Sequence, residues 1–326
     1  MATTTVQTHD WRAQAANQTR LAYGQALLEV AARDPKAVVL SADTQDLLGI
    51  RPYMARYPER FVEVGIAEQN AIGIASGLAT TGLHAYVCGY APFISARSME
   101  QVRNDVAYAH QRVVIGAAAS GISLGVSGGT HHALEDLALM RSLPHMTVIV
   151  PADVDEAYQA TLATLDIDGP VYIRLGGRVE EPPVADPTAA PFRLGQATRL
   201  REGSDVTVIA CGCMVEMAVR ASRTLASEGI GVRVLNMHTI KPLDREAILQ
   251  AAAETRGIVT AEEHHLTGGL GGAVAELLAV EHPTRMRLVG MPDDFAVVGP
   301  TVPLRAKYGM SAEAIATACR SLLRAA

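Results

Sequence analysis

Runs of apolar, β-branched residues alternate with stretches of helical periodicity along the first half of the chain. The predicted strands are 37–40, 84–87, 112–115, 146–150 and 171–175, and the predicted helices include 17–33, 98–110 and 154–165. Continuous apolar strands separated by helices are typical of a parallel sheet with both faces covered. The pattern therefore predicts the α/β fold class for this half.

The same alternation returns in the second half, after a segment rich in proline. Residues 176–192 contain four prolines together with small and acidic residues, which indicates a linker. Beyond it we expect strands at 205–210, 231–235 and 257–261 and helices at 215–228, 244–254 and 270–282. The predicted organisation is a first domain over 1–185, a linker over 186–192 and a smaller α/β domain over 193–326.

Composition and charge narrow the classes of partner. The chain has 326 residues, of which 49% are hydrophobic, and a net charge of −6 without a run of Lys or Arg. This balance argues against nucleic acid or an anionic membrane as the main partner. A polar N-terminus and the lack of an 18-residue apolar run predict a cytoplasmic protein acting on small molecules. Reduced core thiols are expected at Cys88, Cys211, Cys213 and Cys319.

Glu68 and Gln69 are adjacent polar residues inside a small, apolar stretch that runs from 62 to 79. Burial raises the pKa of a carboxyl group, and a nearby basic nitrogen gives its proton a destination. Glu68 is therefore a candidate general acid. The alternative is a helix N-terminus at which the carboxylate simply faces the positive end of the dipole.

Two further segments carry polar or aromatic groups where a strand is expected to lead into a helix, the usual ligand edge of an open α/β sheet. In the first, Phe93 and Arg97 could stack on and orient a planar ligand, although a phenylalanine such as Phe93, taken alone, is more often a core residue. In the second, a Gly/Ser-rich loop leads to His131 and His132. His131 is a candidate hydrogen-bonding or acid/base group, and the alternative is a capping or solvated histidine.

Arg174 ends the apolar strand predicted at 171–175, where a charge needs an anionic partner or exposure. If Arg174 does not bind a ligand, the expected alternative is that it forms a salt bridge at the surface. The glycines within 268–272 precede a helix and could cradle a phosphate. Close helix packing explains them more simply, because no P-loop lysine or dinucleotide fingerprint accompanies them.

Taken together, these segments resemble the C-terminal part of transketolase, and especially the second subunit of bacterial split transketolases. The resemblance covers nearly the whole chain and rests on many short stretches in matched order and spacing, among them 41–43, 56–61, 65–70, 130–144, 148–153, 170–175, 240–244 and 262–264. It implies a pyrimidine-binding parallel-sheet domain of a thiamine diphosphate enzyme, followed by the smaller α/β transketolase C-terminal domain.

The resemblance also implies roles for individual residues. Glu68 matches the glutamate that gives its proton to N1′ of the cofactor's aminopyrimidine and so promotes formation of the ylide. Phe93 matches the ring that stacks on the pyrimidine. Tyr90, Arg97 and Asp43 complete the expected cofactor site, and His131 matches the histidine that touches the substrate's oxygens.

The diphosphate and its divalent cation, Mg²⁺ or a similar ion, are held in this family by a Gly-Asp-Gly motif, which this sequence lacks. No metal ligand is therefore expected on this chain. The resemblance implies a partner of the N-terminal transketolase type that carries the motif, assembled with this chain as a heterotetramer. Alone, the chain is expected to show no thiamine-dependent turnover.

Two departures from the family bear on the substrate. Ala118-Ala119 stand where close relatives carry Thr-His, and Ser127 stands where they carry an acidic residue. The remaining candidates for substrate binding are His131, His132, Ser127 and Arg174. We therefore expect an unusual sugar: unphosphorylated, differently substituted, or specific to a dedicated pathway.

Three other interpretations stay open at this point. The chain also resembles the β subunit of a 2-oxo-acid dehydrogenase, although 130–136 and 141–144 favour transketolase. A deoxyxylulose-phosphate-synthase-like acyl-transfer enzyme is the second, but the arginine of its Asp-Arg-Ala-Gly stretch is replaced by Ala119. The third is a degenerate subunit without catalysis, which the joint presence of Glu68, Phe93 and His131 disfavours.

Overall fold

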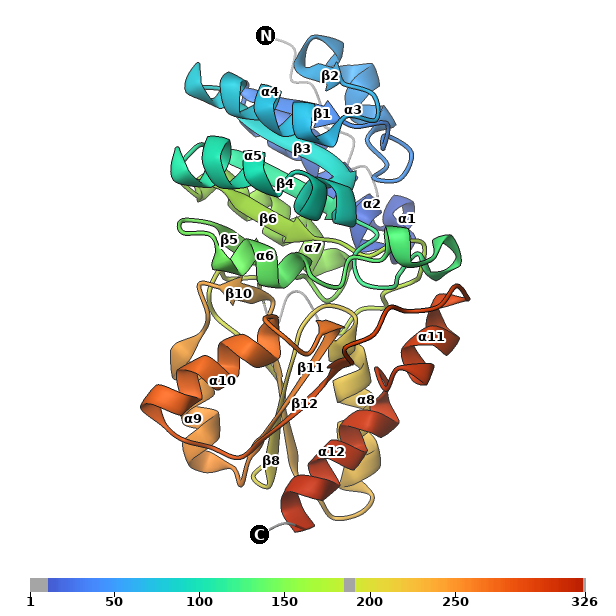
Figure 1. Ribbon diagram of the computed structural model, residues 1–326, viewed down its shortest axis with the longest axis vertical. Helices are drawn as coiled ribbons and strands as arrows, with labels where there is room; N and C mark the ends of the chain where they lie inside the picture. The colour runs from blue at the N-terminus through green and yellow to red at the C-terminus, as the bar shows by residue number, and fades with distance from the viewer. Residues whose placement is uncertain (1–10, 185–190, 325–326) are drawn as a thin grey trace, which may run out of the picture.

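Two β-sheets form the framework of the protein, one above the other along the long axis (Figure 1). The computed structural model describes residues 11–184 and 191–324. The first sheet has seven strands in the order β10-β5-β6-β4-β3-β1-β2, and the second has five in the order β12-β11-β8-β9-β7. The strands are β1 (Ala37–Ser41), β2 (Phe61–Glu63), β3 (His84–Tyr90), β4 (Val113–Ala118), β5 (Thr147–Ile149), β6 (Val171–Arg174), β7 (Thr198–Arg201), β8 (Val206–Ala210), β9 (Val232–Asn236), β10 (Thr239–Lys241), β11 (Ile258–His265) and β12 (Met286–Met291).

Helices cover both faces of each sheet (Figure 1). On the first sheet α2 packs against α7 on one face, while α4 and α6 lie on the other. On the second sheet α8 and α12 pack together, and α9 and α10 lie on the opposite face. The α-helices are α1 (Trp11–Ala15), α2 (Thr19–Arg33), α3 (Arg51–Arg56), α4 (Glu68–Thr80), α5 (Met99–Gln101), α6 (Asp136–Ser142), α7 (Val154–Ala163), α8 (Met214–Ala226), α9 (Arg245–Glu254), α10 (Leu270–Glu281), α11 (Thr301–Lys307) and α12 (Ala312–Arg324).

The central strands of the first sheet run parallel, as their continuous apolar sequences predict. All four residues of β6 are buried, and so are all six of β4. In the register of the sheet, Tyr90 is paired with Ala118 and Arg174 with Ala117. The carboxyl ends of β3, β4 and β6 therefore meet at one edge of the sheet, which brings the loops after them together.

The strand β10 joins the two halves of the chain in a way that the sequence analysis did not predict. Although it belongs to the second half, it pairs antiparallel with β5 of the first sheet, Thr239 opposite Ile149. The strand has three residues, too few for a recognisable alternation of apolar and polar positions. Of the linker predicted at 186–192, residues 186–190 lie outside the described part of the chain.

A second contact between the halves is polar and buried. Glu156, in the first turn of α7, accepts a hydrogen bond from Asn236 Nδ2 at 2.9 Å across the boundary. Burial raises the pKa of Glu156 to about 8, although the backbone N–H of Ala152 and the Asn236 amide act in the opposite direction. The carboxyl group is therefore protonated over much of the neutral range.

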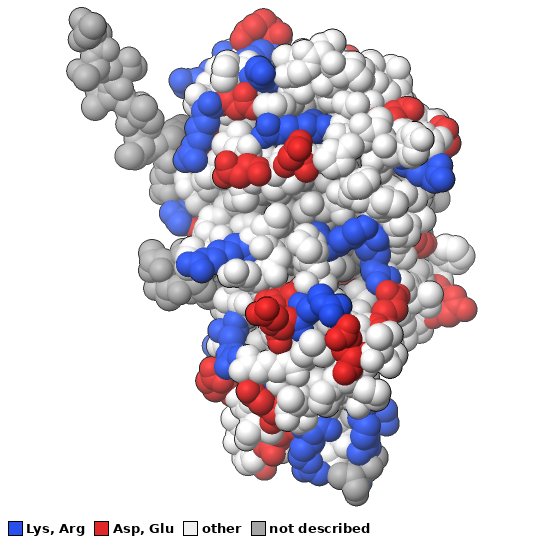
Figure 2. All heavy atoms as spheres, turned by 90° about the vertical axis from the view of Figure 1, so that its left-hand side faces the viewer, with Lys and Arg blue, Asp and Glu red and all other residues white. Residues whose placement is uncertain are grey.

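Charged side chains are mixed on the molecular face that Figure 2 shows. Lys and Arg side chains lie next to Asp and Glu side chains there, and no extended area of one sign is visible on this face.

Candidate active site

Glu68 is the first residue of α4, and its side chain is 3% exposed. The carboxylate lies at the positive end of the helix dipole, and Arg97 Nη1 donates a hydrogen bond to its Oε2 at 3.0 Å. Both neighbours stabilise the charged carboxylate. The sequence left open a buried acid or a helix N-terminus, and the structure combines the two, with a cation placed beside the acid.

Three rings contact one another, and Arg97, the hydrogen-bond partner of Glu68, lies over one of them, Phe93. Tyr90 ends β3, Phe93 follows it in a segment of π-helix, Phe93–Arg97, and His131 reaches them from the Gly/Ser-rich loop. The ring centroid of His131 is 5.2 Å from that of Phe93 and 5.8 Å from that of Tyr90, both edge to face. The structure thus brings together Glu68 and the three ring-bearing residues that the sequence analysis selected.

The Gly/Ser-rich loop that carries His131 is closed at its base by backbone hydrogen bonds. Gly121 and Ala133 exchange them, from Gly121 N at 2.8 Å and from Ala133 N at 3.0 Å. Gly121 has φ +60°, and a Cβ atom added there would lie 2.4 Å from Glu263 Oε2. The base of the loop is therefore closely packed against Glu263. This packing fixes the position from which His131 approaches Phe93.

The other two candidates on this loop have different environments. Ser127 is exposed and ends a short 3₁₀ turn, Gly125–Ser127. His132 is 5% exposed, and among the described residues neither of its ring nitrogens has a hydrogen-bond partner at normal geometry. Burial lowers the pKa of His132, so its imidazole is neutral at pH 7. His132 therefore lies inside the protein, whereas His131 is half-buried.

The structure places Arg174, a predicted substrate-binding residue, in a buried ion pair. Its guanidinium is buried and forms an ion pair with Asp136, with Nε 2.8 Å from Oδ2 and Nη2 3.0 Å from Oδ1. Nη2 also donates to the carbonyl oxygens of Ala133 and Glu263. The alternative of a surface salt bridge is wrong, because the side chain of Asp136 is fully buried. Arg174 ties the base of the His131 loop to the second sheet.

Asp43 lies after β1 with an exposed side chain and a left-handed backbone, φ +54°. Its backbone N–H donates to Glu63 Oε1 at 2.9 Å, and the same oxygen accepts from Gly65 N at 2.8 Å. A non-glycine residue in this region costs free energy that the surroundings must offset. Glu63 thus fixes two backbone turns, one at Asp43 and one just before Glu68.

Sequence reasoning missed a pair of arginines close to this edge of the sheet. Arg20, on α2, is buried and donates through Nε to the carbonyl of Gly177 at 2.8 Å. Burial lowers the pKa of Arg20, and so does the positive charge of Arg178, whereas Tyr90 acts against them. Arg178 is exposed. The sequence did contain a signal for Arg20. It is a charged residue near the start of α2, a helix whose other buried positions are mostly small or apolar.

The glycines within 268–272 do not form a phosphate cradle. The Glu262 carboxylate already accepts hydrogen bonds from the first N–H groups of α10, Leu270 N at 2.7 Å and Gly271 N at 2.8 Å. A Cβ atom at Gly269 would lie 2.0 Å from Glu262 Oε2. Burial raises the pKa of Glu262 to about 7, with these N–H groups acting against it. The glycines allow close packing, as the simpler interpretation held.

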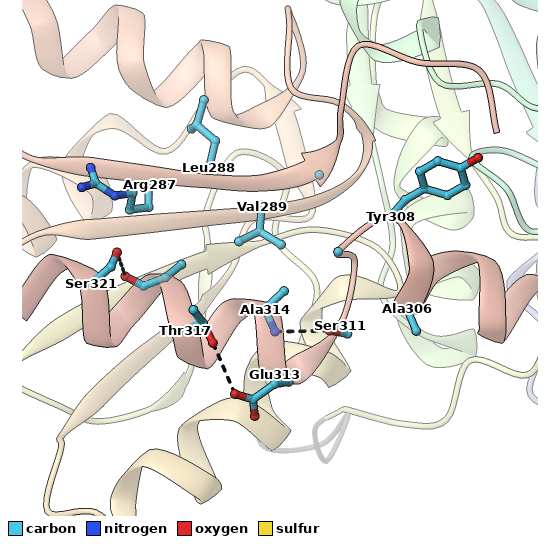
Figure 3. Close-up of a pocket in the computed structure, with 13 residues that line it drawn as sticks. Arg287, Leu288, Val289, Ala306, Tyr308, Ser311, Glu313, Ala314, Thr317 and Ser321 are labelled. Atoms are coloured by element: carbon cyan, nitrogen blue, oxygen red, sulfur yellow. Dashed lines mark hydrogen bonds between the residues drawn. The ribbon is translucent and has the colours of Figure 1, made fainter.

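A groove of about 560 Å³ lies between the edge strand β12 and α12, away from the residues described so far (Figure 3). Each of the four hydroxyl groups in its lining has a hydrogen-bond partner within the chain, on Tyr308, Ser311, Thr317 and Ser321. Figure 3 shows that side chains of β12, of α12 and of the segment before α12 line the groove. Because these hydroxyl groups are already hydrogen-bonded within the chain, the groove offers few free polar groups to a ligand.

Within residues 11–184 and 191–324, no cluster of three or more His, Cys, Asp or Glu side chains is arranged to hold a metal ion. The same part of the chain contains no helix with the length and apolarity needed to cross a membrane. The arrangement around Glu68 can bind and orient a planar ring and exchange a proton with it.

Two protein-family models match the chain. Residues 15–178 match the pyrimidine binding domain of transketolase, and residues 195–315 match the transketolase C-terminal domain. An apulose-4-phosphate transketolase subunit from Phocaeicola vulgatus is 40% identical over 93% of this chain and 96% of its own length. The 6-deoxy-6-sulfo-D-fructose transketolase subunit SqwH from Clostridium sp. is 42% identical over 92% of each chain.

A solved structure described as a split gene transketolase, inactive beta4 tetramer, is 42% identical, with a TM-score of 0.86 over 94% of this chain and 98% of that one. A 1-deoxy-D-xylulose-5-phosphate synthase from Geobacter sulfurreducens is 39% identical over 93% of this chain, but the match spans only 48% of that enzyme. The split subunits are thus matched along nearly their whole length.

Proposed function

The chain belongs to the transketolase family, and from this we propose that it is one subunit of a split, thiamine diphosphate-dependent transketolase. The assembled enzyme would transfer a two-carbon ketol unit from a ketose to an aldehyde. The observation that carries the proposal is the buried Glu68 carboxylate, held beside Phe93, Tyr90 and His131 at the carboxyl edge of the first sheet.

The residues around Glu68 fit the aminopyrimidine of thiamine diphosphate. The space in front of Phe93 already accepts a planar group, because the Arg97 guanidinium lies over that ring and donates to Glu68. Phe93 would hold the pyrimidine by stacking, and Glu68 would hold a proton at N1′. When bound, thiamine diphosphate supplies the carbon nucleophile that attacks the ketose carbonyl. Tyr90 and His131 would exclude water from one side of the site.

His131 is the proposed contact for the substrate's hydroxyl or carbonyl oxygens. It is half-buried, and Thr130 Oγ1 lies 3.0 Å from its Nδ1. This contact fixes the ring and leaves Nε2 as the nitrogen available to the substrate. Asp43 and Ser127 are exposed near the same edge of the sheet and remain proposals as cofactor and substrate contacts.

The enzyme is proposed to need a partner subunit. The Gly-Asp-Gly motif is missing from the sequence, and the described residues contain no metal-ligand cluster. A partner of the N-terminal transketolase type would supply the ligands of the diphosphate and of Mg²⁺ or a similar cation. The description of the 42% identical relative as an inactive tetramer of β chains supports this division of labour. We propose a cytoplasmic heterotetramer of two such pairs, active in carbohydrate metabolism.

The proposed substrate is a ketose other than the common pentose phosphates. One relative is named for apulose 4-phosphate and the other for 6-deoxy-6-sulfo-D-fructose, so both of these transketolase subunits carry the names of uncommon sugars. In this chain Ala119 and Ser127 replace polar family positions, while Arg20, which lies near both Tyr90 and Arg178, brings positive charge to this edge of the sheet. A sugar with an anionic substituent at its far end fits this arrangement.

Reconstitution tests the proposal. The chain would be mixed with the subunit that carries the Gly-Asp-Gly motif, thiamine diphosphate and Mg²⁺, and assayed with a panel of ketoses and 2-oxo acids. Ketose-dependent two-carbon transfer supports it, and the ketose with the highest kcat/KM identifies the donor. Pyruvate decarboxylation without ketose cleavage would move the chain to the dehydrogenase or acyl-transfer alternatives.

A further inference from the structure

We propose that Arg97 is a placeholder for the cofactor's aminopyrimidine: its guanidinium occupies the pyrimidine position in the free subunit and must swing out when the ring binds. The inference rests on the proposed function, because it concerns the same Glu68 and Phe93. It reverses the role expected from the sequence, in which Arg97 helps to hold the cofactor.

The position of the Arg97 guanidinium carries the inference. Its central carbon lies 4.5 Å from the centroid of the Phe93 ring, and its Nη1 is 3.0 Å from Glu68 Oε2. These are the two side chains expected to stack on the pyrimidine and to hold its N1′ proton. A pyrimidine ring cannot lie against the same face of Phe93, in line with Glu68, while the guanidinium is there.

The chemical likeness between the two groups explains why both suit this position. A guanidinium is planar, delocalised and rich in N–H donors, and it stacks readily on aromatic rings. An aminopyrimidine that carries a proton on N1′ is also planar and presents an N–H to an acceptor. Arg97 thus adds a hydrogen bond and a positive charge to the stabilisation that the buried Glu68 carboxylate receives from the α4 dipole.

Arg97 is also placed to leave. Its side chain is 48% exposed, whereas that of Glu68 is 3% exposed, so the arginine reaches into the site from the solvent side. It lies at the end of the π-helical segment Phe93–Arg97, a wide turn of the kind that often occurs at functional sites. A long side chain with one end in water can change rotamer without moving the backbone.

The test uses the chain alone and the fragment 4-amino-5-hydroxymethyl-2-methylpyrimidine, with affinity measured by calorimetry. Arg97→Ala and Arg97→Gln should each bind it about tenfold more tightly than the parent chain, because no ion pair or cation–π contact has to be broken first. The matched control is Arg103→Ala, since Arg103 is an exposed arginine of the same region that hydrogen-bonds only to its neighbour Asn104 among the described contacts. It should leave the affinity unchanged.

A second readout follows the arginine itself. The Nε–H resonance of Arg97, assigned by its loss in Arg97→Gln, should shift when the fragment saturates the parent chain. Equal or weaker binding by both Arg97 variants would overturn the inference and restore the cofactor-holding role. If neither the parent chain nor the variants bind the fragment, the pyrimidine site itself fails, and with it the proposed function; equal binding by all of them rejects only the placeholder.

Discussion

Replacing Arg174 by methionine tests whether this residue is structural or binds the substrate. Methionine keeps much of the volume of the side chain but removes its charge and its donors. The change deletes both contacts to Asp136 and the hydrogen bonds to the carbonyls of Ala133 and Glu263. Asp136 keeps a hydrogen bond from the Tyr172 hydroxyl at 2.7 Å, and its carboxylate would otherwise be buried without a counter-charge.

The expected cost follows from that burial. Removing one partner of a buried ion pair destabilises a protein by about 3 to 5 kcal/mol, because the remaining charge stays desolvated. The Arg174 guanidinium lowers the pKa of Asp136, against the effect of burial. Without it the carboxyl group becomes easier to protonate. Arg174→Met with Asp136→Asn should therefore cost less than the two single changes added together.

The assay is urea unfolding of the free chain at pH 7, followed by circular dichroism, with binding of the substrate to the assembled enzyme measured separately. The control is Arg199→Met, since Arg199 pairs with an exposed glutamate, Glu202, and should change the free energy of unfolding by less than about 1 kcal/mol. If Arg174→Met unfolds like the parent chain but raises KM for the ketose, the structural explanation is wrong and the substrate role is restored.

Three further changes test other parts of the account. Glu68→Gln should lower kcat of the reconstituted enzyme about 10²- to 10⁴-fold, because the amide cannot exchange a proton; full activity would exclude proton transfer by Glu68. Glu156→Gln should become more stable than the parent chain as pH rises from about 5 to 8, because burial raises the pKa of Glu156 to about 8 and the folded state then holds a proton that the unfolded state releases. Unfolding at several pH values measures this, and a constant difference would contradict it. Gly121→Ala should destabilise the chain by about 1 to 3 kcal/mol, seen in its melting temperature, because φ is +60° and the new Cβ meets the Glu263 carboxylate; an unchanged melting temperature would show that the base of the loop is loosely packed.

Local pattern was sufficient to predict five of the seven strands of the first sheet, but not the three-residue strands β2 and β10. The strands β1, β3, β4, β5 and β6 are continuous apolar runs, and parallel strands align their carboxyl ends. Phe93 and His131 follow two such strands, so an edge-of-sheet argument brought them together, whereas Tyr90 was expected from the family resemblance. Glu68 could be selected because its carboxyl group stands out in an apolar stretch.

Long-range pairings explain what the sequence reasoning missed. The partner of Arg174 is Asp136, 38 residues away, and nothing near Arg174 in the chain shows that it will be buried. The contact of Arg97 with Glu68 spans 29 residues and depends on the π-helical turn after Phe93. Such contacts follow from the tertiary arrangement and not from spacing.

The most direct test of the central claim is thiamine diphosphate-dependent ketol transfer by the purified chain, measured alone and with the subunit that carries the Gly-Asp-Gly motif. The account predicts no turnover by the chain alone and turnover when both subunits, the cofactor and Mg²⁺ are present. Appreciable activity of the chain without any partner would contradict it.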